Sequence, residues 1–436
     1  MNYDEAISFL NTFTNYERQM GLMKTEKLDP KRVGLMLKNA GLDYSNIKIF
    51  HIAGTKGKGS TAFYLSRLLL YAGHKKVGLY TSPHLFKINE RIQLNGRYIK
   101  DIELFRLIEN YKSYIESIKN KFQPTYFDIL TFLAMAYFIE KECDFIVLEV
   151  GLGGRMDSTN FCKPLVSIIT SIGYDHTAIL GKTLRKIAME KGGIIKDNIP
   201  LVLARQEEEA LKEVLKIAHK RKAKVYYFPE CISYEIQKRD PGGIIFDATI
   251  KTGGNIHTFS SIRLKQIGDI FVENFLLATL SLLAVGKDLQ KRILKKAGNE
   301  KISFRIEKRK NFVFDVAHND SSLEILFKTV LDYFKSQKSH LYISILADKE
   351  IDRIARVIEK YAHSFERILV FDFPSTRKTG GEILFQYLKH LPHVKYIPSL
   401  NMVPPDHSAL NVIAGSFQIM ERALKWAGFH FPSAKL

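Results

Sequence analysis

A glycine-rich segment from His51 to Thr61, HIAGTKGKGST, carries the sharpest chemical signal in the sequence. Glycines let a backbone wrap closely around a phosphate, so that successive N–H groups point inward and the following helix adds its positive end. A lysine in such a loop neutralises the β- and γ-phosphates, and a hydroxyl binds Mg²⁺ or phosphate. The segment predicts a nucleotide site made by consecutive residues: Gly54, Thr55, Lys56, Gly57, Lys58, Gly59, Ser60 and Thr61.

The match to the usual phosphate-loop pattern is imperfect. Lys58 is followed by Gly59 rather than by Ser or Thr, and Gly54 lies three residues before Gly57 rather than five. The simpler interpretation is a glycine-rich turn between a strand and a helix. The apolar run before the segment and the amphipathic stretch after it are the context that a phosphate loop requires, so phosphate binding is the preferred interpretation.

A second signal is FIVLEVGLGGR, at residues 145–155. Four apolar residues that end in a carboxylate predict a buried parallel strand that presents Glu149 at its carboxyl edge, where α/β sheets bind ligands. Mg²⁺ near nucleotide phosphates commonly takes one or two protein carboxylates. The alternative is an ion pair between Glu149 and Arg155, and this motif alone does not separate the two.

Four further polar segments have ordinary structural explanations when each is taken singly. The pair at 175–176 contains a lone histidine, which is more often a hydrogen-bonding residue than a metal ligand. The charges of EKGG, at 190–193, end a predicted helix and would usually be solvated. SPH, at 82–84, follows a predicted strand, and TYFD, at 125–128, begins a predicted helix with a capping residue.

The elements that position these residues follow from alternating apolar runs and amphipathic stretches, which indicate an α/β fold with a largely parallel sheet. The strands expected in the first part are 47–53, 77–81, 145–150, 166–171 and 201–204. The helices expected there include 60–71, 129–140, 184–191 and 210–220. This part is predicted to be a parallel-sheet ATPase domain that contains the phosphate loop.

The stretch 232–259 differs, because its β-rich segments are broken by turn signals at 240–243 and 252–255. It predicts a small antiparallel flap or edge sheet that closes the first domain, before a helix at 272–285. A second strand–helix alternation predicts a C-terminal Rossmann-like α/β domain with strands at 312–317, 341–346, 368–371, 394–397 and 411–414. The predicted domains are 1–298, which binds ATP, and 299–436.

Composition sets the class of protein. Of 436 residues, 46% are apolar and 25% are charged, which excludes wholesale disorder and fibrous architectures. Three separated cysteines argue against a disulfide scaffold or a cysteine zinc site, and suit a reducing compartment. The first residues lack the pattern of a signal peptide, and no apolar run approaches the ~20 residues of a membrane span. We therefore expect a cytoplasmic protein without a membrane partner.

The net charge of +19 is compatible with nucleic acid or with acidic small molecules as partners. The basic residues are scattered, and no aromatic-rich basic motif for base stacking is present in the sequence. A solvated basic surface is the simpler explanation.

In their order along the chain, the polar segments resemble the folylpolyglutamate synthase/dihydrofolate synthase family of Mur-type ATP-dependent amide ligases. The resemblance is dense over residues 20–200 and thinner towards the C-terminus. The segments that carry it are the phosphate loop, SPHL (82–85), ERI (90–92), TYFD (125–128), LEVGLGGRMDSTN (148–160), TSIGYDHT (170–177) and EKGGIIK (190–196).

This resemblance implies two domains with ATP between them. ATP would phosphorylate a substrate carboxylate, and the amine of L-glutamate would displace the phosphate. The implied cofactors are ATP and Mg²⁺ at two sites, with Ser82 and Glu149 at the first ion and His176 at the second. Lys191 matches the lysine that this family carbamylates. The implied catalytic residues are Lys58, Lys191 and His318.

Further positions follow from the same resemblance. ATP contacts are implied at Asn274, Arg305 and Asp315, and an anion cradle for glutamate at Ser416. The pteroate surface is implied at Thr125, Tyr126, Phe127, Asp128, Met156, Asp157 and Ser158. The sequence departs from the family pattern at Phe271, Phe304 and Val316, which replace a glutamine and two glycines.

The preferred hypothesis is a monomeric ligase that adds L-glutamate to dihydropteroate, to tetrahydrofolate, or to both. A second hypothesis keeps the ligase chemistry but changes the carboxylate acceptor, because the three departures lie at family positions near the active cleft. A third is a basic nucleic-acid-binding ATPase. It leaves LEVGLGGR and EKGGIIK unexplained, so no nucleic-acid partner is expected.

Overall fold

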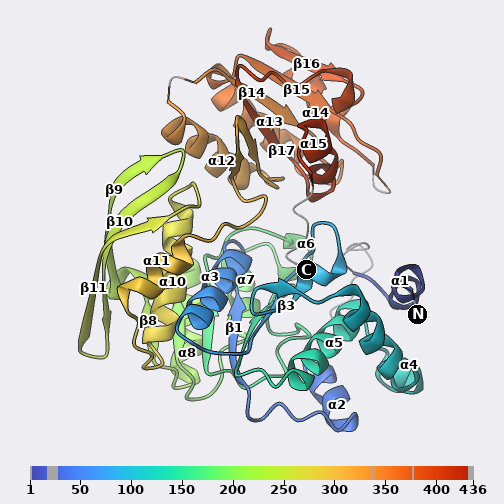
Figure 1. The fold of residues 1–436 in the computed structure, drawn as a ribbon, viewed down its shortest axis with the longest axis vertical. Coiled ribbons are helices and arrows are strands. Elements are labelled where there is room, and N and C mark those ends of the chain that lie inside the picture. Colours follow the sequence, from blue (N-terminus) through green and yellow to red (C-terminus); the bar gives the residue numbers. More distant parts are fainter. Residues whose placement is uncertain (1, 17–27, 336, 376–377, 431–436) are drawn as a thin grey trace.

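The computed structural model describes residues 2–16, 28–335, 337–375 and 378–430. Its elements form two lobes, the first coloured blue to yellow and the second orange to red in Figure 1. The larger lobe is built on an eight-stranded sheet in the order β4-β3-β2-β5-β1-β6-β7-β8. Its strands are β1 (Lys48–Ala53), β2 (Val77–Tyr80), β3 (Ile92–Leu94), β4 (Arg97–Tyr98), β5 (Phe145–Glu149), β6 (Val166–Ile169), β7 (Leu201–Leu203) and β8 (Val225–Tyr227).

In this order the six strands β2, β5, β1, β6, β7 and β8 run parallel to one another. The two strands β3 and β4 add an antiparallel edge beside β2. Successive side chains of a strand point to opposite faces, and β1 shows the consequence. Phe50 and Ile52 enter a core shared with the helices α3 (Lys58–Tyr71) and α10 (Ile270–Leu283), whereas Ile49 enters a core shared with α5 (Tyr126–Glu140). Burial on both faces explains why β1 and β5 read as continuous apolar runs.

Helices cover both faces of this sheet (Figure 1). Those of the larger lobe are α1 (Tyr3–Asn11), α2 (Arg32–Asn39), α3 (Lys58–Tyr71), α4 (Asp101–Phe122), α5 (Tyr126–Glu140), α6 (Thr177–Leu180), α7 (Leu184–Gly192), α8 (Glu208–Lys220), α9 (Phe228–Cys231), α10 (Ile270–Leu283) and α11 (Lys291–Gly298), with the 3₁₀ helix η3 (Ile88–Arg91).

The predicted flap is a separate three-stranded antiparallel sheet of β9 (Ile232–Asp240), β10 (Gly243–Thr252) and β11 (Asn255–Leu264). Both predicted turns are confirmed. The alternative of an edge sheet is wrong, because no strand of the flap pairs with the eight-stranded sheet in the described part of the chain. Its buried face instead contacts α10, where the rings of Phe246 and Phe275 lie 6.2 Å apart.

The smaller lobe has a six-stranded sheet in the order β12-β13-β17-β14-β15-β16, parallel except for β12. Its strands are β12 (Glu307–Arg309), β13 (Phe312–Phe314), β14 (Ser339–Ile343), β15 (Arg367–Phe371), β16 (Val394–Ile397) and β17 (Leu410–Ala414). Its helices are α12 (Asp320–Tyr333), α13 (Ile351–Tyr361), α14 (Gly381–Leu388) and α15 (Met420–Trp426), with the 3₁₀ helices η4 (Ala362–Ser364), η5 (Leu400–Met402) and η6 (Phe417–Ile419).

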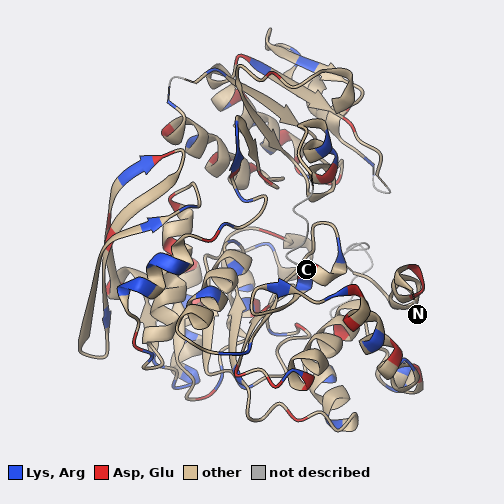
Figure 2. Ribbon diagram, viewed as in Figure 1, with Lys and Arg blue, Asp and Glu red and all other residues tan. Residues whose placement is uncertain are grey.

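The predicted α/β class is therefore confirmed in both lobes. The predicted division at 298/299 falls between the end of α11 and the start of β12, and stays a prediction. Figure 2 shows Lys and Arg spread over both lobes and interleaved with Asp and Glu. Within the described ranges, every helix is too short or too polar to cross a membrane.

Candidate active site

The glycine-rich segment forms the turn from β1 into α3. Gly54 and Gly57 have φ angles of 147° and 84°, which L side chains rarely adopt. A Cβ on Gly57 would collide with the side-chain oxygen of Asn274, which also faces the Thr61 hydroxyl at 3.5 Å. Lys58 is the first residue of α3, so the loop leads directly into the positive end of a helix.

Neighbouring segments hold this loop in place. The Thr55 amide donates to the Ser171 carbonyl at 2.8 Å, and the Thr55 hydroxyl donates to the Gly173 carbonyl at 3.1 Å. The Lys56 ammonium donates to the hydroxyl of Ser321, at the start of α12 in the smaller lobe. The side chains of two predicted loop residues, Thr55 and Lys56, thus bind neighbouring segments of the protein.

Glu149 ends β5 beside this helix start. Its side chain is buried, and its carboxylate would lie 3.4 Å from a Cβ on Gly59. Burial raises the pKa of Glu149, while the charges of Lys58, Arg305 and Arg91 oppose that shift. The alternative ion pair with Arg155 is wrong, because Arg155 pairs with Glu190 at 2.9 Å. Glu149 instead accepts a hydrogen bond from the Ser82 amide at 3.1 Å.

The loop after β2 carries Ser82. Its following residues are fixed by Glu90, whose carboxylate accepts from the amides of Leu85, Phe86 and Lys87 at 2.7–2.8 Å. The next residue, Arg91, donates to His84 at 2.8 Å. The segments SPHL and ERI therefore form one folded unit that delivers Ser82 to Glu149.

Lys191, in α7, is buried, and its ammonium donates to the Gly54 carbonyl at 2.7 Å. Burial, together with the nearby charge of Lys58, lowers the pKa of Lys191 to about 7. His176 precedes α6, and burial lowers its pKa too, against the charge of Asp175. The charge of Lys58 affects the pKa of Glu149, His176 and Lys191 alike, so all three side chains lie within electrostatic reach of the start of α3.

No group of three or more His, Cys, Asp and Glu side chains forms a metal-binding cluster among the residues that the structure describes. A site that holds Mg²⁺ through one carboxylate, water and nucleotide phosphates does not require such a cluster. The buried carboxylate of Glu149 at the start of α3 fits that kind of site.

The predicted pteroate residues lie at the start of α5 and in the loop after β5. Asp128 is enclosed, since its carboxylate accepts from Arg32 at 2.6 Å, from the Thr125 amide at 2.8 Å and from the Ser158 hydroxyl at 2.6 Å. Sequence reasoning missed Arg32, because a lone arginine in a surface-like helix belongs to no motif. Asp157 is also buried and binds the Leu152 amide at 2.9 Å.

The rest of this surface is less enclosed. Tyr126 is buried at the first position of α5, and the Phe127 ring faces the Tyr80 ring at 5.9 Å. Met156 is half-buried. The predicted pteroate residues therefore do lie together, with Asp157 near enough to Lys191 for its charge to raise the pKa of that lysine against burial.

In the smaller lobe, Arg305 lies just before β12, and Asp315 and His318 follow β13. The Asp315 carboxylate accepts from the amides of Ile306 and Ala317 at 2.7 and 2.6 Å, and burial raises its pKa to about 6. Burial lowers the pKa of His318 to about 4, helped by the positive charge of Lys349. Asp315 thus holds together the two segments that bear the predicted ATP contacts.

The three departures from the family pattern have different structural consequences. Val316 is not among the residues of positive φ, so it replaces glycine without backbone strain. Phe304 has a φ of 56° and thus adopts the left-handed geometry that glycine favours. Phe271 is buried in the core and is not among the residues that line the cleft between the lobes.

Ser416 follows Gly415, where a Cβ would collide with the Ser344 carbonyl. The Ser416 hydroxyl accepts from the Gln418 amide at 3.1 Å and so caps η6. The next residue, Phe417, places its ring under the Arg305 guanidinium at 5.5 Å and beside the His318 ring at 6.0 Å. Sequence reasoning missed Phe417, although its place beside the predicted Ser416 was a usable signal.

A cleft of about 820 Å³ lies between the candidate site residues of the larger lobe and those of the smaller lobe. Its larger-lobe wall includes Ser60, Ser82 and Glu149, and its smaller-lobe wall includes Arg305 and Phe417. The segment that connects the lobes is clamped by Gln266, which donates to the Arg305 carbonyl and accepts from the Ile302 amide at 2.8 Å. Gln266 was also missed, because a lone glutamine outside a motif gives no signal.

Comparisons with known proteins agree with this geometry. Residues 52–282 match the Mur ligase middle domain. The chain is 33% identical over 384 residues to a dihydrofolate synthase/folylpolyglutamate synthase of Bacillus subtilis, covering 85% of this chain and 86% of that one.

Solved structures give the same relationship. A folylpolyglutamate synthase of Thermotoga maritima superposes with a TM-score of 0.84 at 30% identity, over 100% of this chain and 99% of that one. An FPGS–AMPPCP–folate complex superposes with a TM-score of 0.78 at 25% identity, over 98% and 99%. The resemblance read from the order of the motifs is confirmed, and the chain belongs to the folylpolyglutamate synthase/dihydrofolate synthase family of Mur-type ligases.

Proposed function

We propose that this protein is an ATP-dependent amide ligase that adds L-glutamate to dihydropteroate, to tetrahydrofolate and its polyglutamates, or to both. The observation that carries the proposal is the cleft, where the phosphate loop and Glu149 face Arg305 and Phe417. Two lobes that meet at a nucleotide can align a carboxylate on one side with an amine on the other.

The proposed reaction has two steps. An oxygen of the acceptor carboxylate attacks the γ-phosphorus of ATP, which forms an acyl phosphate and releases ADP. The neutral amine of glutamate then attacks the acyl carbon, the C–O bond to phosphate breaks, and the amine gives up a proton as the amide forms. A carboxylate becomes a usable electrophile only once its oxygen can leave as phosphate, so the ATP is consumed in activation.

The chain's own residues neutralise charge in the first step. Lys58 at the start of α3 and Arg305 across the cleft would bind phosphate oxygens, which is the main requirement of phosphoryl transfer. Asn274 supports the phosphate loop, and Asp315 positions the Arg305 segment. His318, whose lowered pKa keeps it neutral near pH 7, would contact glutamate without repelling its ammonium group.

Mg²⁺ at two sites belongs to the proposal. A buried carboxylate whose pKa is raised by desolvation is stabilised by a cation, so Glu149 fits the first ion together with Ser82. His176 would hold the second ion with a carbamylated Lys191. When bound, Mg²⁺ neutralises charge that develops on the phosphates.

The acceptor is proposed to use the surface around Thr125, Asp157 and Ser158, where polar side chains are already fixed by hydrogen bonds. L-Glutamate is proposed to use the Gly415–Ser416 turn. We also propose that the protein is a monomer and that it is cytoplasmic. The free cysteines Cys143, Cys162 and Cys231 suit a reducing compartment.

Release of ADP in a coupled assay tests the function. ADP and phosphate should appear only when ATP, L-glutamate and a pteroate or folate are all present, and mass spectrometry should find the acceptor extended by glutamate. ATP binding without phosphate release for any pteroate or folate would contradict the proposal. The same assay with other carboxylic acids tests the second candidate, an altered acceptor, which Phe304 and Val316 favour because both line the cleft.

A further inference from the structure

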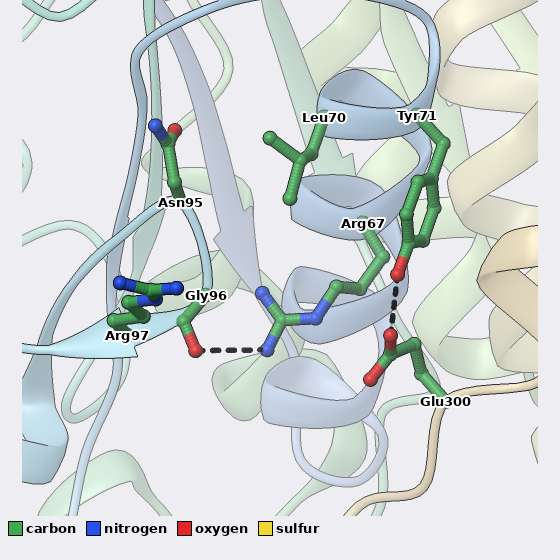
Figure 3. A pocket seen from close by; sticks show the side chains of 7 residues that line it. All are labelled: Arg67, Leu70, Tyr71, Asn95, Gly96, Arg97 and Glu300. Carbon is green, nitrogen blue, oxygen red and sulfur yellow. Dashed lines mark hydrogen bonds between the residues drawn. The ribbon is translucent and has the colours of Figure 1, made fainter. Parts of the chain in front are cut away.

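A second hollow, of about 490 Å³, opens at the far end of α3 from the phosphate loop. Figure 3 shows Arg67, Leu70 and Tyr71 extending from α3, with Asn95, Gly96 and Arg97 of the β3–β4 turn opposite. Glu300, which follows α11, closes the hollow and accepts a hydrogen bond from the Tyr71 hydroxyl. We call this site the Arg67 pocket, lined by Arg67, Leu70, Tyr71, Asn95, Gly96, Arg97 and Glu300.

Arg67 is the unusual member of this pocket. Its side chain is only 8% exposed, and its guanidinium lies over the Phe63 ring at 4.6 Å. Its hydrogen bond to the Gly96 carbonyl is long, at 3.5 Å, and it forms no ion pair with any described residue. Glu300 acts on it only at a distance, through its charge. A buried guanidinium with most of its donors unused is costly unless a ligand supplies the partner.

The Arg67 pocket continues into the cleft between the lobes. Arg67, Gly96 and Glu300 line both hollows, and the cleft reaches Gly59 and Glu149 at the phosphate loop. Along α3, Arg67 lies about 12 Å beyond Gly59, at about 1.5 Å per residue. An extended molecule whose reacting carboxylate lies near Glu149 can therefore reach Arg67.

A γ-linked glutamyl chain has a matching spacing. Each residue adds five main-chain bonds of about 1.3–1.5 Å, or about 6 Å when extended, and each carries a free α-carboxylate. A carboxylate about 12 Å behind the reacting one is what a preceding glutamyl residue presents. An acceptor with a single glutamate has no second glutamyl carboxylate to present at that distance.

We propose that the Arg67 pocket is a subsite for an α-carboxylate of acceptors that already carry two or more γ-linked glutamates, with Arg67 as the charge partner. The proposal rests on the proposed function and adds a residue that selects acceptors by tail length. The exposed Arg97 supplies a second positive charge at the rim. Glu300 acts in the opposite direction, because its carboxylate repels the same anion.

The test compares acceptors with one, two and three glutamates in the wild-type enzyme and in Arg67→Gln. We expect the KM of the two longer acceptors to rise about tenfold or more in the variant, the usual scale for one charge-assisted contact. The KM of the monoglutamate and the kcat for all acceptors should change less than about threefold. Equal losses for all three acceptors, or no loss, would overturn the proposal.

Glu300→Gln separates binding from damage to the fold, since it should lower the KM of the longer acceptors while Arg67→Gln raises it. A general disturbance of the pocket would raise both. Arg97→Gln should weaken binding of the longer acceptors, by less than Arg67→Gln does. Because Arg97 is exposed, this variant remains informative even if Arg67→Gln folds poorly. If Arg97→Gln and Glu300→Gln leave the tail-length preference unchanged, the subsite is refuted. Absence of ligation by the wild-type enzyme with every acceptor would instead refute the proposed function, and this proposal with it.

Discussion

At the scale of single residues, the site is dominated by ionisable groups that burial holds near neutrality. Glu149 and Asp315 have raised pKa values, and Lys191 and His318 have lowered ones, each because desolvation disfavours the charged form. Without ligands these groups reduce the stability of the folded protein. Their energetic cost is offset when a nucleotide and its cation arrive.

Glu149→Gln tests this account at the first predicted metal ligand. A carboxyl with a raised folded-state pKa gives stability that is present at low pH and lost as the pH rises through that pKa, so the wild-type apoprotein is penalised at neutral pH. The variant should raise the apo Tm at pH 7 by about 1–3 °C. It should also lower ADP release at least about 100-fold, the scale of losing one charge-stabilising group.

Glu142→Gln is the matched control, because Glu142 is an exposed carboxylate that pairs with Lys76. It should change neither Tm nor activity. A Glu149→Gln enzyme of ordinary activity, with an unchanged Tm shift on adding Mg²⁺ and ATP, would exclude Glu149 from the metal site.

Lys191 should show a pH-dependent reaction with CO₂. Its pKa of about 7 means that the neutral amine, which attacks CO₂ and loses a proton, becomes the main form only above pH 7. A carbamate signal in ¹³C NMR should therefore grow between about pH 6 and about pH 8, because the ratio of neutral to protonated amine rises about tenfold per pH unit. Lys191→Arg should abolish both this signal and most ADP release.

The exposed Lys182 provides the comparison, since Lys182→Arg should keep the signal and the activity. A wild-type signal that does not depend on pH over this range would contradict the lowered pKa. Full activity in CO₂-free buffer would show that carbamylation is not required.

At this scale the sequence locates a residue where a motif marks the end of an element. Lys58, Glu149 and Lys191 lie at or next to the ends of elements that the sequence predicts, so their place at one sheet edge follows from topology, while their roles stay predictions. Arg67, Gln266 and Phe417 could not be found that way. Their roles arise from packing between segments far apart in the chain, which periodicity does not report.

At the scale of elements, the sequence predicted the central strands and the flap but not the β3–β4 edge. These strands have only three and two residues, too short for an alternating pattern. Their turn, Asn95-Gly96, was a usable signal, since both residues have positive φ, at 51° and 77°, as in hairpins of this kind. One wall of the Arg67 pocket, formed by Asn95, Gly96 and Arg97, belongs to this short edge.

Asp269, just before α10, joins three elements and gives a prediction at this scale. It accepts from Arg239 of β9 at 2.7 Å and from the Tyr333 hydroxyl of α12 at 2.8 Å. Tyr333→Phe removes one hydrogen bond between the lobes and keeps the ring. It should lower the free energy of unfolding by about 0.5–1.5 kcal/mol, measured by denaturant titration.

Tyr387→Phe, at an exposed tyrosine of α14, should leave that free energy within about 0.5 kcal/mol of the wild type. If both substitutions have the same effect, the Asp269 junction does not contribute to holding α12 against α10.

At the scale of the whole molecule, the two lobes touch through few polar contacts beside the phosphate loop. The Lys56–Ser321 hydrogen bond is one of them, and it uses a lysine that the sequence assigned to ATP. Ser321→Ala should loosen the nucleotide-free protein, so that its radius of gyration in solution scattering increases. An ATP analogue should restore the wild-type value, because phosphates would then attract Lys56.

Ser113→Ala, on the exposed side of α4, should leave the scattering curve unchanged with and without the analogue. A Ser321→Ala protein as compact as the wild type would mean that this bond does not hold the lobes together. The lobe arrangement was the part of the fold least accessible to the sequence, because it depends on polar and apolar contacts between segments far apart in the chain rather than on any repeating pattern.

The ring contact between Phe86 and Phe304, at 5.4 Å, joins the Ser82 loop to the residue that precedes Arg305. Any molecule that shifts the Ser82 loop therefore also displaces the backbone that aims the guanidinium. Thermodynamic reciprocity then requires that acceptor and nucleotide change each other's affinity by one common factor. Binding of the acceptor and binding of the nucleotide would consequently be coupled without a separate regulatory site.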